Sequence, residues 1–74
     1  MPKLPALTAK KLIKALEKIG FELDHQTGSH RIYYHPRTAR KAVIPYHVKD
    51  LPKGTLLSII KQSGITKEEL INYL

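Results

Sequence analysis

The first third of the chain carries apolar residues at the spacing of one helical face. These residues are Leu12, Ile13, Leu16 and Ile19. Steps of three and four residues bring side chains to one side of an α-helix. Thr8 precedes the pattern and can accept a hydrogen bond from the first turn, while Gly20 follows it and suits a helix end. The pattern therefore predicts a helix between Thr8 and Gly20.

A strand is predicted next, over residues 21–26 (FELDHQ). Apolar and polar residues alternate there, as they do in a strand whose two faces meet different surroundings. Strict alternation places Phe21 and Leu23 on one face of this strand. Glu22 and Asp24 then lie on the opposite face.

A second strand follows after a short turn at Thr27 and Gly28. Residues 30–35 (HRIYYH) are rich in β-branched and aromatic side chains, and Pro36 ends the run. The two strands are expected to form a hairpin. Residues 41–44 (KAVI) predict a short third strand, because the proline that follows cannot donate a hydrogen bond to a sheet.

Two helices are predicted in the last third of the chain. Residues 50–54 predict a loop that leads into a helix over about residues 55–62, before Gly64. Thr66 and Glu69 have the spacing of a capping box, which opens a last short helix. The apolar residues available for packing are Leu56, Leu57, Ile59, Ile60, Leu70, Ile71 and Leu74.

These elements predict an α+β fold of order αβββα with a short C-terminal helix added. Helices on one face of a three-stranded antiparallel sheet form a two-layer domain, and the other face of the sheet can meet a ligand. A chain of 74 residues is expected to form a single domain over residues 1–74. The absence of cysteine excludes disulfides and thiolate metal sites, and it fits an intracellular protein.

The chain is basic, with 13 Lys and Arg against 6 Asp and Glu and a net charge of +7. Such an excess favours a polyanionic partner such as nucleic acid, or a strongly acidic protein. Residues 29–61 hold seven of the cations and one acid, Asp50. Scattered lysines that only keep the surface hydrated are the simpler alternative. The sequence has no signal peptide and no apolar run of about 18 residues, so we expect a cytoplasmic protein without membrane contact.

The chain has four residues that can transfer protons near neutral pH, namely His25, His30, His35 and His47. His25 and His35 lie at predicted strand ends, where a hydrogen-bonded or solvated histidine is common. His47 lies in a loop. His30 follows the Gly28-Ser29 turn at the start of a strand, where the sheet would fix the ring and leave it open to a ligand.

A histidine in this position can cleave RNA, because RNA supplies its own nucleophile. If His30 takes the proton of a 2′-hydroxyl, that oxygen can attack the adjacent phosphorus and leave a cyclic phosphate and a 5′-hydroxyl. Nearby Lys or Arg would stabilise the developing charge. The histidine spacings match no metal-binding motif and Ser29 lies in no known nucleophile motif, so we expect neither a metal nor another cofactor.

Aromatic residues add a weaker indication of RNA binding. Tyr33, Tyr34 and Tyr46 could stack on bases. Aromatic residues in strands more often fill the core, so we expect at least one of Tyr33 and Tyr34 to be buried.

Two stretches of the sequence match the motifs of a known family. Each stretch alone is a weak indication, but the two in this order are quite specific. The first is GSH at residues 28–30, continuing as RIYYHP to residue 36. The second is VIPYH at residues 43–47, followed by KGTL at residues 53–56. They resemble the HicA family of toxins from bacterial and archaeal toxin–antitoxin modules. The resemblance runs from about Thr8, through the Gly20-Phe21 junction, to Ile65.

The resemblance implies a fold similar to the double-stranded RNA-binding domain and cleavage of mRNA that arrests translation. His30, in the Gly-Ser-His motif, would be the catalytic residue. The implied partners are mRNA and a HicB-like antitoxin, and no DNA is expected for the toxin alone. The family-like core would cover about residues 8–65, with residues 66–74 as a helical extension.

Further site residues are inferred from charge and position, and the family motif gives them no firm role. We expect RNA contacts from Ser29, Arg31, His47, Lys49 and Lys53. The group that protonates the leaving oxygen stays open between His47 and His35, with a slight preference for His47.

Three functions remain after these steps. The leading one is a metal-independent endoribonuclease that uses His30 as general base or acid. The second is a module of the same fold that binds RNA without cutting it, whose affinity would depend strongly on salt. The third places the basic surface against an acidic protein, without any role for RNA.

Overall fold

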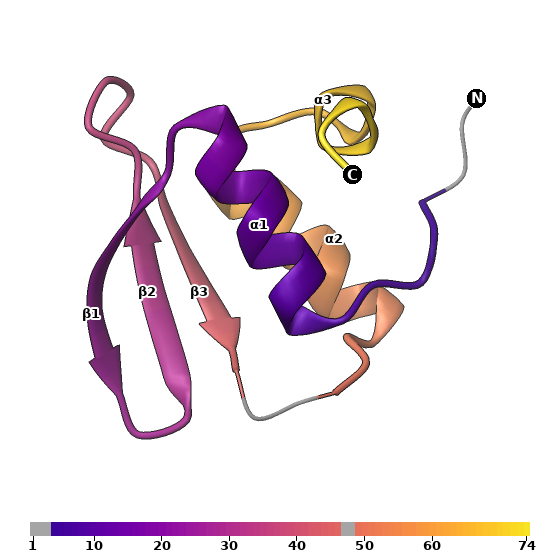
Figure 1. Cartoon of the computed structure of the whole chain (residues 1–74), viewed down its shortest axis with the longest axis horizontal. Helices are drawn as coiled ribbons and strands as arrows, with labels where there is room; N and C mark the ends of the chain where they lie inside the picture. Colours follow the sequence, from indigo (N-terminus) through magenta and orange to yellow (C-terminus); the bar gives the residue numbers. More distant parts are fainter. Residues whose placement is uncertain (1–3, 47–48) are drawn as a thin grey trace.

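The computed structural model of the chain describes residues 4–46 and 49–74. It is a two-layer α+β structure in which helices flank a three-stranded antiparallel sheet (Figure 1). The elements follow in the order α1 (Ala9–Ile19), β1 (Glu22–Thr27), β2 (His30–Tyr34), β3 (Lys41–Pro45), α2 (Lys53–Ser63) and α3 (Lys67–Asn72). The predicted fold class and order of elements are confirmed. No described helix is long and apolar enough to cross a membrane.

Local capping fixes the ends of α1 and α3 where the sequence predicts them. The Thr8 side chain accepts a hydrogen bond from the Lys11 backbone N–H, and Gly20 ends α1 with a φ of 125°. Thr66 and Glu69 form the complete capping box, each side chain accepting from the backbone N–H of the other. Helix α2 begins at Lys53, slightly before the predicted start, because the Pro52 carbonyl already accepts from Leu56 N.

The sheet has the order β1-β2-β3 and two different faces. Tyr33, Ala42 and Ile44 are buried and face the helices, since α1 and α2 both pack on β3. The expectation that at least one of Tyr33 and Tyr34 is buried is confirmed, with Tyr33 in the core. The neighbouring residues alternate to the opposite side, which we call the open face. On β2 and β3 the open face carries His30, Ile32, Tyr34, Lys41 and Val43.

Strand β1 departs from the simple alternation that its sequence suggests. It starts at Glu22, and Phe21 is 3% exposed while Leu23 is 48% exposed. Leu23 is paired with buried Tyr33 and therefore lies on the helix side, but β1 is the edge strand and the helices pack on β3. The register shifts between Leu23 and His25, so Asp24 is the additional residue of a β-bulge.

One hydrophobic core joins all three helices to the sheet. Its most deeply buried large side chains are Leu12, Leu16, Tyr33, Ile44 and Leu70. Leu70 belongs to α3 and is 0% exposed, so the segment after residue 65 contributes directly to the core. Full burial of such a side chain stabilises a fold by about 1.5–3 kcal/mol.

Candidate active site

His30 is the first residue of β2 and follows a tight hairpin turn. The turn consists of Gly28, with a φ of 56°, and Ser29. A two-residue turn that matches the twist of its strands requires a positive φ at its first central position, which glycine adopts without strain. His30 is exposed and is paired with Thr27 on one side and Pro45 on the other. Its backbone is thus fixed by both neighbouring strands, while its side chain lies on the open face.

Segments distant in the sequence meet at this end of the sheet (Figure 1). The Ser29 carbonyl accepts a hydrogen bond from Tyr46 N at 2.8 Å, which ties the hairpin to the end of β3. A bridge between Thr8 and Asp50 joins the start of α1 to the connection between β3 and α2. Exposed Lys49 lies on that same connection.

Arg31 lies on the other side of the sheet from His30. Its guanidinium lies 3.7 Å from the centre of the Tyr46 ring, and its Nε donates to Gln26 Oε1 at 3.3 Å. Together with Lys10 and Lys14 of α1, Arg31 lines a pocket of about 240 Å³. Tyr46 and one acid, Glu17, also line this basic pocket, which is near the hairpin but does not share the face of His30.

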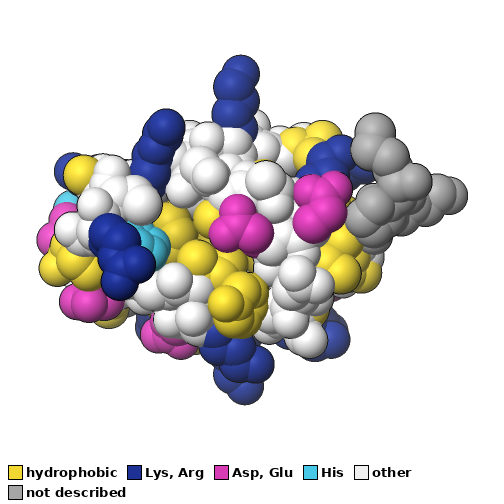
Figure 2. Space-filling view, turned by 90° about the horizontal axis from the view of Figure 1, so that it is seen from above, with side chains coloured by type: hydrophobic (Ala, Val, Ile, Leu, Met, Phe, Trp, Pro, Cys, Tyr) yellow, Lys and Arg dark blue, Asp and Glu magenta, His cyan; other side chains and the backbone are white. Residues whose placement is uncertain are grey.

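The cations of residues 29–61 do not form one patch. Arg37, Arg40 and Lys41 lie at the β2–β3 turn, at the end of the sheet opposite the hairpin. Figure 2 looks onto that opposite end, where Lys and Arg side chains project in several directions with acidic side chains between them. Net charge alone therefore does not identify one RNA-binding face. Of the predicted RNA contacts, Lys49 and Lys53 are exposed and lie near the start of α2.

His25 lies on the open face, although strict alternation would place it on the helix side with Leu23. The bulge at Asp24 adds one residue, so every later residue of β1 changes face. His25 is then paired with Ile32, and Thr27 with His30. His25 Nδ1 lies 3.0 Å from Asp24 Oδ2, and an ionised carboxylate only accepts hydrogen bonds, so Nδ1 carries the proton.

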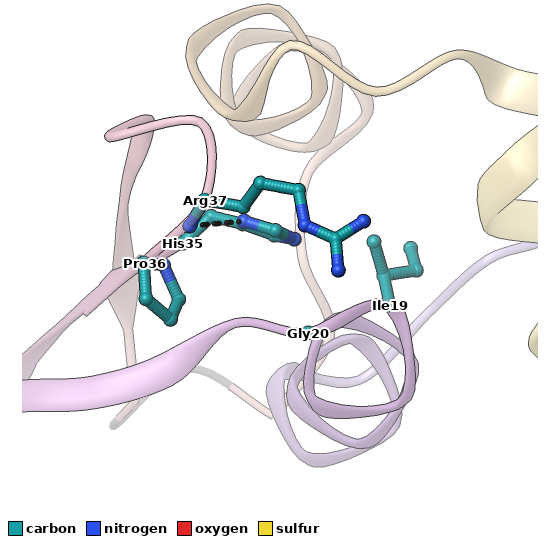
Figure 3. Close-up of a pocket in the computed structure, with 5 residues that line it drawn as sticks. All are labelled: Ile19, Gly20, His35, Pro36 and Arg37. Carbon is teal, nitrogen blue, oxygen red and sulfur yellow. Dashed lines mark hydrogen bonds between the residues drawn. The ribbon is translucent and has the colours of Figure 1, made fainter.

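His35 has a structural position at the opposite end of β2. Its Nδ1 accepts from the backbone N–H groups of Arg37 and Thr38, at 3.2 and 3.3 Å, and its ring packs edge-on against Phe21. Figure 3 shows the ring beside Gly20, where an added Cβ would lie 2.7 Å from His35 Nε2. Five residues of strand separate His35 from His30 by roughly 16 Å. The two rings cannot serve one phosphate group.

The remaining candidates from the sequence are His47 and a metal site. His47 lies outside the described residues. Among residues 4–46 and 49–74, no group of three or more His, Cys, Asp or Glu side chains could hold a metal ion. Of the histidines in that part of the chain, His25 and His30 are the two that lie on the open face.

Comparison with known proteins identifies the family. The family model described as HicA toxin of bacterial toxin–antitoxin matches residues 9–65. The matched region includes the hairpin with His30 and most of the helical layer. No curated protein matches the chain significantly. The resemblance carried by the Gly-Ser-His and VIPYH stretches is confirmed, and the chain belongs to the HicA toxin family of bacterial toxin–antitoxin systems.

Proposed function

We propose that this toxin is an endoribonuclease that cleaves mRNA in the cytoplasm and so arrests translation. The observation that carries the proposal is the position of His30, which the hairpin and both neighbouring strands fix at an exposed site on the open face. The Gly28-Ser29-His30 motif lies inside the region that matches the toxin family. Histidine is suited to proton transfer at neutral pH, which is what cleavage of RNA through its own 2′-hydroxyl requires.

The reaction requires few groups besides a base. His30 takes the proton of the 2′-hydroxyl, the 2′-oxygen attacks the adjacent phosphorus, and the bond to the 5′-oxygen breaks. The products are a 2′,3′-cyclic phosphate and a 5′-hydroxyl, and DNA is not cut because it lacks the 2′-hydroxyl. Cations such as Lys49 attract the phosphate backbone and stabilise charge that develops at phosphorus.

The basic pocket on the helix side supports a second function, RNA binding without cleavage. Arg31, Lys10 and Lys14 would hold phosphates, and the Tyr46 ring is held by Arg31 in a stack that a base could extend. If the protein is a nuclease, this pocket holds the RNA backbone on one side of the sheet while His30 acts on the other side. In the binding module His30 would be irrelevant.

A toxin of this family has an antitoxin as its partner, and we propose a HicB-like protein that covers the open face. Val43 at the centre of this face is 40% exposed, and Ile32 and Tyr34 beside it are only partly buried. Apolar side chains in the middle of a sheet face favour a protein contact. A partner seated there would also cover His30 and block cleavage by occlusion.

The products of cleavage test the proposal. Purified toxin is incubated with end-labelled RNA, and the new termini are identified by their reaction with polynucleotide kinase. The proposal predicts 5′-hydroxyl and cyclic phosphate termini. It also predicts that a single 2′-deoxy nucleotide at the cleavage site blocks cutting there. RNA that is bound in a salt-dependent manner but left intact would support the binding module instead.

A further inference from the structure

The open face holds a second histidine whose position relative to His30 is set by the strand register. Thr27 is directly opposite His30, and His25 precedes Thr27 by two residues on the same face. His25 and His30 are therefore diagonal neighbours on adjacent strands. Diagonal neighbours have Cα atoms about 7–8 Å apart, a separation that long or ring side chains can bridge. At that separation two imidazole rings can reach the same phosphate group.

The β-bulge is what makes this arrangement possible. Consecutive strand residues normally point to opposite faces. At a bulge two residues oppose a single partner, so Asp24 and His25 can both turn toward the open face. Their side chains accordingly meet, with His25 Nδ1 at 3.0 Å from Asp24 Oδ2. This contact fixes the imidazole in an exposed position and leaves Nε2 as its outward nitrogen.

We propose that His25 is the general acid that protonates the 5′-oxygen when it leaves, and that Asp24 positions the His25 ring. This inference rests on the proposed function, in which His30 takes the proton of the 2′-hydroxyl. In this step His25 starts as the imidazolium, with one proton on Nδ1 facing Asp24 and a second on Nε2. As the bond between phosphorus and the 5′-oxygen breaks, the oxygen keeps the electron pair and receives the Nε2 proton, which leaves a neutral ring. The proton gained by His30 and the proton lost by His25 balance, so water restores both rings after each turnover.

No other described side chain on this face fits the role as well. Thr27 faces His30 directly, but its hydroxyl is a very weak acid. Lys41 is paired with Tyr34, at the far end of the strands. His35 is held by two backbone amides at that same far end. His25 combines an imidazole ring, exposure and a carboxylate that orients the ring, which is the arrangement that proton-transferring histidines use.

A substrate with a sulfur leaving group distinguishes the general acid from the general base. RNA is prepared with a 5′-bridging sulfur at the cleavage site. A thiol has a pKa of about 8.5, far below that of an alcohol. The thiolate therefore leaves without a proton. Single-turnover rates are measured on the oxygen and sulfur substrates for wild type, His25→Ala, His30→Ala and Asp24→Asn, after circular dichroism and thermal unfolding have shown that each variant is folded.

We expect His25→Ala to lower the rate on the oxygen substrate by about 10²–10⁴-fold, the usual contribution of general acid catalysis. On the sulfur substrate its rate returns to within a few-fold of wild type. His30→Ala is slow on both substrates. Asp24→Asn loses less rate than His25→Ala on the oxygen substrate and no rate on the sulfur substrate, because Asp24 only positions the His25 ring.

Three results would overturn the inference. His25→Ala could match wild type on the oxygen substrate, it could be equally slow on both substrates, or His47→Ala could show the sulfur-specific recovery in its place. Failure of the proposed function looks different, because wild type itself would then cleave neither substrate.

Discussion

Gly20→Ala is expected to destabilise the fold through His35. Gly20 has a φ of 125°, a conformation that L-residues rarely adopt. The added Cβ would lie 2.7 Å from His35 Nε2, closer than carbon and nitrogen can approach. The ring cannot simply swing away, because it packs on Phe21 and accepts hydrogen bonds from Arg37 N and Thr38 N.

The size of the effect follows from these contacts. A non-glycine residue held in an unfavourable backbone conformation costs about 1–3 kcal/mol. Displacing His35 removes two hydrogen bonds, each contributing about 0.5–1.5 kcal/mol. The free energy of unfolding should therefore fall by about 2–6 kcal/mol, a large part of the 5–15 kcal/mol that is typical of a small domain. The midpoint of urea unfolding should drop by at least about 1 M.

Urea unfolding followed by circular dichroism measures this loss, and Gly54→Ala is the matched control. Gly54 lies in α2 without a positive φ, and an added Cβ there would meet nothing within 4 Å. Its replacement should leave the midpoint unchanged or raise it slightly. In the double variant Gly20→Ala/His35→Ala the clash is gone, so the combined loss should be smaller than the sum of the single losses. A Gly20→Ala midpoint equal to that of wild type would refute the structural role assigned to His35.

Three further changes test other parts of the molecule. Leu70→Ala should lower the unfolding free energy by about 2–5 kcal/mol because Leu70 is fully buried, and a loss below about 1 kcal/mol in urea unfolding would contradict its place in the core. Arg31→Ala should weaken RNA binding and reduce the slope of log affinity against log salt by about one, and an unchanged slope would exclude a phosphate contact by Arg31. Val43→Asp should leave stability nearly unchanged but weaken binding of a HicB-like antitoxin by at least about tenfold, because it places a charge on an apolar contact surface. If Val43→Asp and wild type bind the antitoxin with equal affinity in a titration, the interface does not lie on the open face.

Local chemistry explains why the helices could be predicted from the sequence. The caps of α1 and α3 act on their own next turn, from Thr8 to Lys11 and from Thr66 to Glu69. Gly28 likewise determines a turn by its own backbone freedom. Such signals need no knowledge of the remaining chain, so the ends of these elements agree closely with the predicted ones.

The arrangement of the site needed information that the sequence pattern does not carry. The run FELDHQ alternates without interruption, and nothing in it marks Asp24 as the additional residue of a bulge. The pairing of β1 with β2 determines that register, and only the register places His25 beside His30. The role of His35 was equally hidden, because it depends on backbone amides in the following turn and on packing against Phe21. The sequence alone therefore left the second catalytic group open between His47 and His35, with a slight preference for His47, and did not single out His25.

The catalytic role of His30 is tested by the rate of RNA cleavage in EDTA, measured for wild type beside His30→Ala and His30→Asn of verified fold. We predict that wild type cuts the RNA and that both variants lose at least about 10²-fold in rate while they still bind it. Cleavage by the variants at the wild-type rate would show that His30 does not carry the reaction.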